Sequence, residues 1–202
     1  PVDGRSIKKI ARYQQFRAVH KSIERIKSGT DRKSKSGVIW HTQGSGKSLT
    51  MVFLTLKIRR DPELRDYKMV FITDRTQLDT QLTATFENTQ NETIHHADSV
   101  KDLKELLQND ASDIITAMVQ KFQESAEEEG FPVLNESNKI IVLADEAHRT
   151  QYGTLGAAIN VGLPNAAKIA FTGTPLIKSE KTTNEFGSYI DTYTIEQSVE
   201  DG

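Results

Sequence analysis

Two separated segments carry residue types that suit the hydrolysis of a nucleoside triphosphate. The first, residues 41–48, reads His-Thr-Gln-Gly-Ser-Gly-Lys-Ser. Its glycines, Gly44 and Gly46, let the backbone turn N–H groups toward an anion without a Cβ in the way. Lys47 is long enough to reach the β- and γ-phosphates, and the Ser48 hydroxyl can ligate Mg²⁺. The segment therefore predicts a loop that cradles phosphates.

The flanks of this segment place it between a strand and a helix. Residues 37–40 form a short apolar run that begins with glycine, which is typical of a buried strand. Residues 49–58 read as a mostly buried helix, and Arg59, Arg60 and Pro62 suit its C-terminal end. A phosphate loop requires this strand–loop–helix context, which argues against a chance Gly/Ser-rich turn.

One position departs from the usual phosphate-loop pattern. In Gly-x-x-x-x-Gly-Lys-Ser/Thr, the first glycine falls on His41 of this chain. A residue with a Cβ rarely adopts a positive φ. We therefore expect that position 41 either does not need a positive φ or tolerates one.

The second segment is the acidic pair Asp145 and Glu146, which follows the nearly all-apolar run 139–144. Such a run is typical of a central parallel strand covered on both faces. Ligands of open α/β sheets bind at the carboxyl ends of the strands. We predict that Asp145 holds Mg²⁺ and that Glu146 orients and deprotonates the attacking water. The alternative is that the two carboxylates only cap the following helix.

The remaining patterns predict an α/β fold, with a parallel β-sheet sandwiched between helices. Apolar runs that end in polar residues recur at 70–75 and 168–175, with a weaker one at 114–117. Helical patterns lie at 76–86, 100–107 and 151–160, and alternation of strand with helix favours a parallel sheet. Residues 5–27 also have helical spacing and predict an N-terminal helix packed on the sheet. His95 and His96 lack a second ligand pair at metal-site spacing, and we interpret them as loop residues.

Four blocks, taken in order, resemble the first RecA-like domain of superfamily 2 helicases and translocases, which is a P-loop NTPase domain. Residues 12–18 look like the Gln motif, 71–78 like motif Ia and 171–175 like motif III, and Asp145-Glu146-Ala147-His148 is a DEAH box. The match is narrower than that. His41 in the loop, together with the segments 40–48, 119–122, 145–153 and 186–193, is similar to the motor (R) subunit of type I restriction endonucleases. The resemblance runs from residue 12 to residue 202.

The resemblance implies an ATP- and Mg²⁺-dependent translocase. The resembled subunit pulls double-stranded DNA toward a complex with methyltransferase and specificity subunits, and cleaves when translocation stalls. Gln15 would read the adenine edge with Arg12 or Tyr13 packing on the base, and Gln14 competes with Gln15 for this role. The implied catalytic residues are Lys47, Asp145 and Glu146; the nucleotide-binding residues are Arg12, Gln15, Thr42, Gly44, Ser45, Gly46, Lys47 and Ser48; the metal ligands are Ser48 and Asp145. His148, Thr172 and Thr174 would couple nucleotide state to DNA grip, and Thr73, Arg75 and Lys121 would face the DNA backbone.

The length of 202 residues predicts one domain with a full core. We divide it into an N-terminal helix with the Gln motif (1–28), a nucleotide-binding core (36–178) and a C-terminal extension (179–202) that leads to a second motor domain. Phosphoryl transfer in this class also needs an arginine finger, which the resembled family carries on that second domain. We therefore expect the 202-residue chain alone to bind ATP weakly and to hydrolyse little of it.

The composition bounds the partners and the location. The 26 basic and 28 acidic residues give a net charge of −2, without the strongly basic footprint of a dedicated DNA-binding module. The chain has no cysteine, which excludes disulfides and thiolate metal sites. It has no signal peptide and no apolar run long enough to span a membrane, so we expect a cytoplasmic location and no membrane partner.

Two other functions stay open at this point. The DEAH box alone also allows another superfamily 2 helicase, such as one that acts on RNA, or a chromatin-type remodeller. The loop alone allows a non-catalytic module that uses a nucleotide as a structural ligand. The residues 40–43 argue against the first alternative, and Glu146 argues against the second.

Overall fold

The sheet that the sequence predicts is present and entirely parallel. The computed structural model describes residues 9–73, 93–118, 132–145, 152–174 and 186–201. Within these ranges, seven strands form one sheet in the order β3-β4-β2-β5-β6-β1-β7, and every neighbouring pair is parallel. The strands are β1 (Gly37–His41), β2 (Lys68–Thr73), β3 (Ile94–Ala97), β4 (Ile114–Met118), β5 (Ile140–Ala144), β6 (Ala167–Thr172) and β7 (Tyr189–Tyr193). The predicted α/β class is confirmed.

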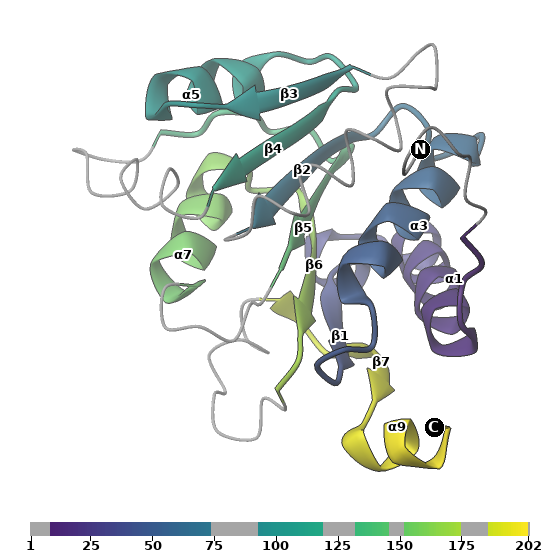
Figure 1. Cartoon of the computed structure of the whole chain (residues 1–202). Helices are drawn as coiled ribbons and strands as arrows, with labels where there is room; N and C mark the ends of the chain where they lie inside the picture. Colours follow the sequence, from purple (N-terminus) through teal and green to yellow (C-terminus); the bar gives the residue numbers. More distant parts are fainter. Residues whose placement is uncertain (1–8, 74–92, 119–131, 146–151, 175–185, 202) are drawn as a thin grey trace, which may run out of the picture.

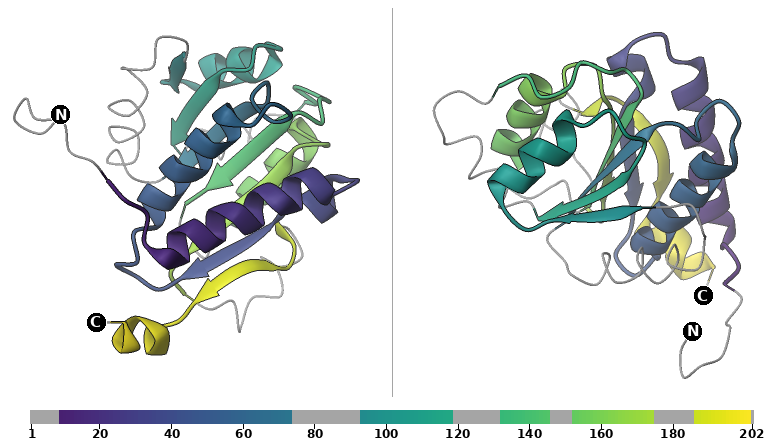
Figure 2. Two further views of the ribbon diagram at one scale, coloured as in Figure 1. Left: turned by 90° about the vertical axis from the view of Figure 1, so that its right-hand side faces the viewer. Right: turned by 90° about the horizontal axis from the view of Figure 1, so that it is seen from above.

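Helices cover both faces of the sheet (Figures 1 and 2). On one face lie α1 (Tyr13–Ser28) and α3 (Lys47–Arg60), which pack against each other. On the other face lie α5 (Val100–Gln108) and α7 (Tyr152–Gly162). Two further helices are short: α2 (Arg32–Lys35) directly precedes β1, and α9 (Ile195–Glu200) follows β7.

Alternating side chains of the central strands form two hydrophobic cores. On β2, Met69 and Phe71 belong to the core under α1 and α3, whereas Val70 and Ile72 belong to the core under α5 and α7. Both sets are fully buried because the strand is covered on both faces. Double burial explains why the central strands read as continuous apolar runs rather than as alternating ones.

The predicted N-terminal helix begins later than its spacing indicates. The prediction started at residue 5, but residues 9–12 are not helical and α1 begins at Tyr13. Arg12 is extended, with ψ of 159°, and its N–H donates to Gln15 Oε1 over 2.9 Å. This bond caps the helix, and Ile10 before it is 77% exposed, so its apolar spacing buries nothing.

The interpretation of His95 and His96 as loop residues was wrong, because both lie in the edge strand β3. His96 Nδ1 lies 2.8 Å from the Thr116 hydroxyl of β4, and His95 Nε2 lies 3.2 Å from the Asp113 carboxylate. An edge strand tolerates polar residues because one side of it faces solvent. Because this strand contains two polar residues, a search for apolar runs does not detect it.

The strand β7 closes the other edge of the sheet beside β1. Part of the segment predicted as a C-terminal extension thus lies in the sheet itself. None of the described helices is both long and apolar enough to cross a bilayer.

Candidate functional site

The predicted phosphate loop joins the end of β1 to the start of α3. His41 is the last residue of β1 and is therefore extended, so the first loop position needs no positive φ. Gly44 and Gly46 do adopt the left-handed backbone, with φ of 83° and 82°. The Ser45 N–H donates to the Thr42 carbonyl over 3.2 Å, and the Thr50 N–H donates to the Gly46 carbonyl over 3.0 Å. The loop therefore delivers a helix N-terminus whose free N–H groups suit an anion.

Gln15 of α1 braces the C-terminal end of this loop. Its Nε2 donates to the Gly46 carbonyl over 3.1 Å, and its Oε1 accepts the Arg12 N–H that caps α1. The side chain is buried, with 3% exposed. The amide predicted to read adenine is thus also a structural link between α1 and the loop.

Replacing Gly46 with alanine is expected to destabilise the protein more than replacing Gly44 does. Both residues have the same left-handed φ, which costs a residue with a Cβ about 1–2 kcal/mol. A Cβ at Gly46 would lie 2.5 Å from Gln15 Nε2, whereas a Cβ at Gly44 meets nothing within 4 Å. Urea unfolding followed by circular dichroism measures both losses, and equal losses would argue against a tight Gln15 contact.

The carboxyl ends of the neighbouring strands bring further predicted residues to the same edge. Asp145 follows β5 directly, is 2% exposed, and its N–H donates to the Ile72 carbonyl of β2. Gly173 follows β6, and a Cβ there would lie 3.1 Å from Lys47 Nζ. The end of β6 therefore lies close to the Lys47 ammonium and leaves no room for a larger residue unless that ammonium shifts. Ser48 lies in the first turn of α3, beside Lys47.

Two predicted threonines close the ends of their strands. Thr73 ends β2 and is 2% exposed, so little of it faces solvent in this structure. Thr172 ends β6, and its hydroxyl accepts the Thr174 N–H over 3.3 Å. This bond closes a short turn at Gly173. Of the other predicted residues, four lie outside the described ranges: Arg75, Lys121, Glu146 and His148.

A pocket of about 380 Å³ lies between the start of α1 and the C-terminal segment, lined by Arg12, Tyr13, Gln14, Tyr193, Ser198 and Asp201. The Tyr13 and Tyr193 hydroxyls both donate to Asp201 Oδ2 over 2.7 Å, and the hydrogen bond to Asp201 raises the pKa of Tyr13 to about 12. Gln14 is 1% exposed, and its Nε2 has no hydrogen-bond partner among the described residues. Such an orphaned buried donor favours a ligand or a water at this place. The buried Ser45 hydroxyl in the loop is likewise without a partner.

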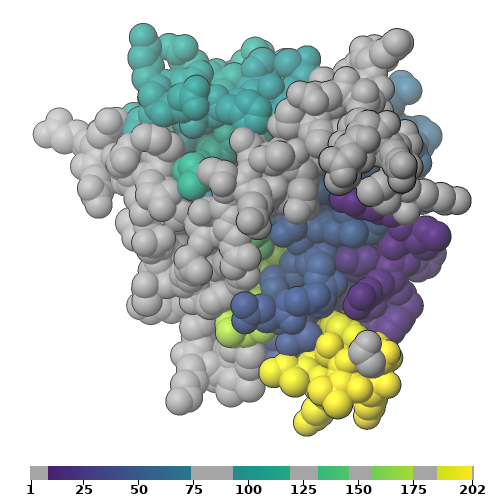
Figure 3. All heavy atoms as spheres, in the orientation of Figure 1, coloured from purple at the N-terminus to yellow at the C-terminus, as the bar shows by residue number. Residues whose placement is uncertain are grey.

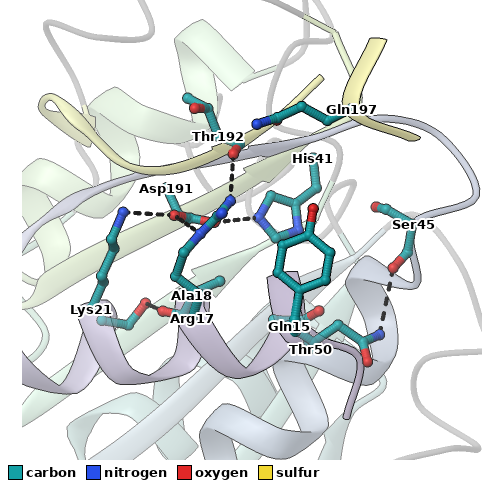
Figure 4. A network of polar contacts seen from close by, with 12 residues as sticks. Gln15, Arg17, Ala18, Lys21, His41, Ser45, Thr50, Asp191, Thr192 and Gln197 are labelled. Carbon is teal, nitrogen blue, oxygen red and sulfur yellow. Dashed lines mark hydrogen bonds and ion pairs between the residues drawn. The ribbon is translucent and has the colours of Figure 1, made fainter. Parts of the chain in front are cut away.

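Sequence reasoning missed a charged cluster around Asp191 of β7. Its carboxylate lies 2.9 Å from His41 Nε2, 2.8 Å from Arg17 Nε and 2.9 Å from Lys21 Nζ (Figure 4). Burial alone raises the pKa of this carboxyl, but hydrogen bonds from His41, Arg17 and Lys21 outweigh it and hold the pKa well below its ordinary value. The sequence showed two cations one helical turn apart, Arg17 and Lys21, and placed Asp191 in the segment 186–193 of the family resemblance, but nothing in it connected the two.

The three elements of this cluster adjoin on one face of the molecule. In Figure 3, α1 (purple), the segment around the phosphate loop (blue) and the C-terminal segment (yellow) lie side by side. The N–H of Thr42 donates to the Tyr193 carbonyl over 2.9 Å, which ties the loop to β7. Thr42 itself is 7% exposed.

Comparisons with known proteins find close sequence similarity over nearly the whole chain. The family model described as SWI2/SNF2 ATPase matches residues 14–202. The chain is 40% identical to the type I restriction enzyme HindI endonuclease subunit of Haemophilus influenzae, over 98% of this chain and 21% of that protein. It is 41% identical to the putative type I restriction enzyme MjaIXP endonuclease subunit of Methanocaldococcus jannaschii, over 96% of this chain and 19% of that protein. The chain thus spans about one fifth of the length of these relatives.

Solved structures share the fold at lower identity. A fragment of a putative HsdR subunit of a type I restriction enzyme from Vibrio vulnificus has a TM-score of 0.64 at 21% identity, over 98% of this chain and 33% of that one. The Sulfolobus solfataricus SWI2/SNF2 ATPase core in complex with double-stranded DNA has a TM-score of 0.60 at 18% identity, over 87% and 34%. These likenesses show that the chain has a RecA-like fold.

Proposed function

The chain belongs to the SWI2/SNF2 ATPase family, and we propose that it is the first motor domain of the endonuclease subunit of a type I restriction–modification enzyme, where ATP hydrolysis drives translocation of double-stranded DNA. The observation that carries this proposal is the 40% identity to such a subunit over nearly the whole chain. The phosphate loop between β1 and α3 supports it, because its glycines have the backbone that a phosphate cradle requires.

The phosphates of ATP would lie on the loop that runs from Thr42 to Gly46. Lys47, at the start of α3 and beside Gly173, would contact the β- and γ-phosphates. The Ser48 hydroxyl and the Asp145 carboxylate supply the oxygen ligands that Mg²⁺ prefers, so the residues present fit this ion. When bound, Mg²⁺ would neutralise charge on the phosphate oxygens. Glu146, which directly follows Asp145, would take the proton of the attacking water.

The base of the nucleotide would lie toward the pocket that Arg12, Tyr13 and Gln14 line. The buried Gln14 Nε2 has no hydrogen-bond partner in the part of the chain that the structure describes, whereas both ends of the Gln15 amide are already engaged. We therefore propose that Gln15 holds the loop against α1 and that reading of adenine by Gln15 requires it to exchange one of these bonds. Gln14 is the better-placed competitor for the base.

Coupling and DNA contact would use the same sheet edge. Thr172 and Thr174 form the turn that contains Gly173, and Gly173 lies close to the Lys47 ammonium, so a change at the phosphates has a short path to this turn. His148 would act with them, and Thr73, Arg75 and Lys121 would face the DNA backbone. The partners would be double-stranded DNA and the methyltransferase and specificity subunits, in the cytoplasm. With a net charge of −2, a local basic face or other domains would have to supply much of the DNA affinity.

Duplex DNA is expected to stimulate ATP hydrolysis by the longest native polypeptide that carries this sequence. The test compares phosphate release with duplex DNA, with single-stranded RNA and without nucleic acid. Stimulation by duplex DNA alone supports the proposal, because a DNA translocase hydrolyses ATP when engaged on its track. Stimulation by RNA alone would instead favour an RNA helicase.

Glu146→Gln separates catalysis from binding in the same assay. If Glu146 activates the water, we expect turnover to fall about 10²- to 10⁴-fold while fluorescent-ATP binding persists. Unchanged slow hydrolysis in this variant would favour a module that holds ATP only as a structural ligand.

A further inference from the structure

Asp191 occupies an unusual place for an aspartate, the middle of a sheet strand. Its side chain is 1% exposed, yet it accepts contacts from three different side chains. Arg17 binds it through two nitrogens, Nε at 2.8 Å and Nη2 at 3.0 Å, and the same Nη2 donates to the Thr192 carbonyl. Lys21, one helical turn further along α1, reaches Asp191 Oδ1 over 2.9 Å. A buried carboxylate without such partners would be costly, so the cluster defines one arrangement of α1 and β7.

The third partner connects this cluster to the phosphate loop. His41 Nε2 lies 2.9 Å from Asp191 Oδ2, and the His41 ring is fully buried. An ionised carboxylate only accepts hydrogen bonds, so Nε2 must carry the proton. His41 Nδ1 is buried and has no hydrogen-bond partner among the described residues, and a bare nitrogen there costs less than a buried N–H donor would. The contact therefore fixes one tautomer and one orientation of the first residue of the loop.

Both ends of the loop are thereby held by the same helix. At the C-terminal end, Gln15 of α1 donates directly to the Gly46 carbonyl. At the N-terminal end, Arg17 of α1 holds Asp191, and Asp191 holds His41. The next residue, Thr42, is tied to β7 through the Tyr193 carbonyl. A glycine at position 41 could not make the contact to Asp191.

We propose that Asp191 is a positioning residue for nucleotide binding, which acts through His41 to hold the start of the phosphate loop in its binding conformation. The proposal rests on the proposed function only in that the loop binds ATP. It assigns a role to the histidine that replaces the usual glycine. It also makes the geometry of the loop depend on the placement of β7.

Asp191→Asn is expected to raise the KM for ATP about tenfold and to change kcat less than about twofold, measured on the longest native polypeptide with saturating duplex DNA. A loop that must be reordered loses ground-state and transition-state contacts equally, which raises KM alone. Because Asp191 acts through His41, the double variant His41→Ala/Asp191→Asn should have a KM within about twofold of either single variant, rather than the product of the two increases.

Asp61→Asn is the matched control. Asp61 also pairs with a cation of α1, Lys27, over 2.9 Å, but at the far end of the helix from the loop. The Asp61→Asn variant should therefore have the same KM for ATP as the wild type. If Asp191→Asn does not fold, His41→Ala reports on the same contact while Asp191 keeps Arg17 and Lys21.

A spectroscopic reading separates this proposal from the proposed function. The Nε2–H proton of His41 should give a downfield NMR signal that Asp191→Asn shifts or abolishes, whether or not ATP is present. A chain that shows this signal but binds no ATP would refute the function and keep the contact. A lower melting temperature in Asp191→Asn with an unchanged KM, or KM increases that multiply in the double variant, would overturn the positioning role.

Discussion

Lys47→Ala is expected to abolish ATP hydrolysis by the native enzyme, with a loss of about 10²- to 10³-fold or more in kcat/KM. Lys47 is the first residue of α3 and is 7% exposed, and its ammonium lies close to Gly173 at the end of β6. A cation held there in advance stabilises charge on the transferred phosphoryl group without reorganising at the moment of reaction. Alanine removes that charge and leaves the helix intact, because it is the best helix former.

Lys57→Ala in the same helix is the control for this prediction. Lys57 also lies in α3 but is exposed, so the same substitution removes the same charge far from the loop. Phosphate release should then stay within about twofold of the wild type, since surface substitutions away from special features have small effects. If Lys47→Ala kept more than a tenth of wild-type turnover while folding normally, the loop would not be the site of hydrolysis.

The sequence predicted those parts of the fold that short-range patterns encode. The strands β1, β2, β4, β5 and β6 are continuous apolar runs because helices cover both sides of them. Their parallel arrangement follows from the alternation of strand with helix. The left-handed backbone at Gly44 and Gly46 was also predictable, because only glycine adopts it cheaply.

The missed features depend on contacts between distant or polar segments. His95 and His96 lie in a strand because the edge of a sheet accepts polar side chains, which erases the apolar signal. The partner of His41 is 150 residues away in the sequence, and no local pattern connects the two. Sequence alone therefore identified position 41 as a departure from the phosphate-loop pattern, and only the fold supplied the carboxylate that explains it.

Asp191→Asn should destabilise the protein by about 3 kcal/mol at pH 7, and the difference from wild type should shrink as the pH falls below about 4. Hydrogen bonds from His41, Arg17 and Lys21 outweigh burial and depress the folded-state pKa of Asp191 below the ordinary value of about 3.9. A carboxyl with a depressed folded pKa stabilises the fold above its unfolded pKa. That stabilisation is lost as the pH falls from the unfolded pKa through the folded one. Asparagine does not titrate, so the variant does not show this loss of stability at acidic pH.

Urea unfolding between pH 3 and pH 8 measures this difference, with Asp61→Asn as the comparison. The hydrogen bond from Lys27 also lowers the pKa of Asp61, so Asp61→Asn should likewise reduce the loss of stability at acidic pH. The change should be smaller, because the Asp61 side chain is 12% exposed whereas that of Asp191 is 1% exposed, and water screens the attraction between Lys27 and Asp61. A pH-independent loss in Asp191→Asn would mean that Asp191 acts by shape alone. If the free energy of unfolding changed equally with pH in the two variants, the Asp191 cluster would stabilise the fold no more than an ordinary ion pair does. The burial of Asp191 and its contact with His41 would then add nothing.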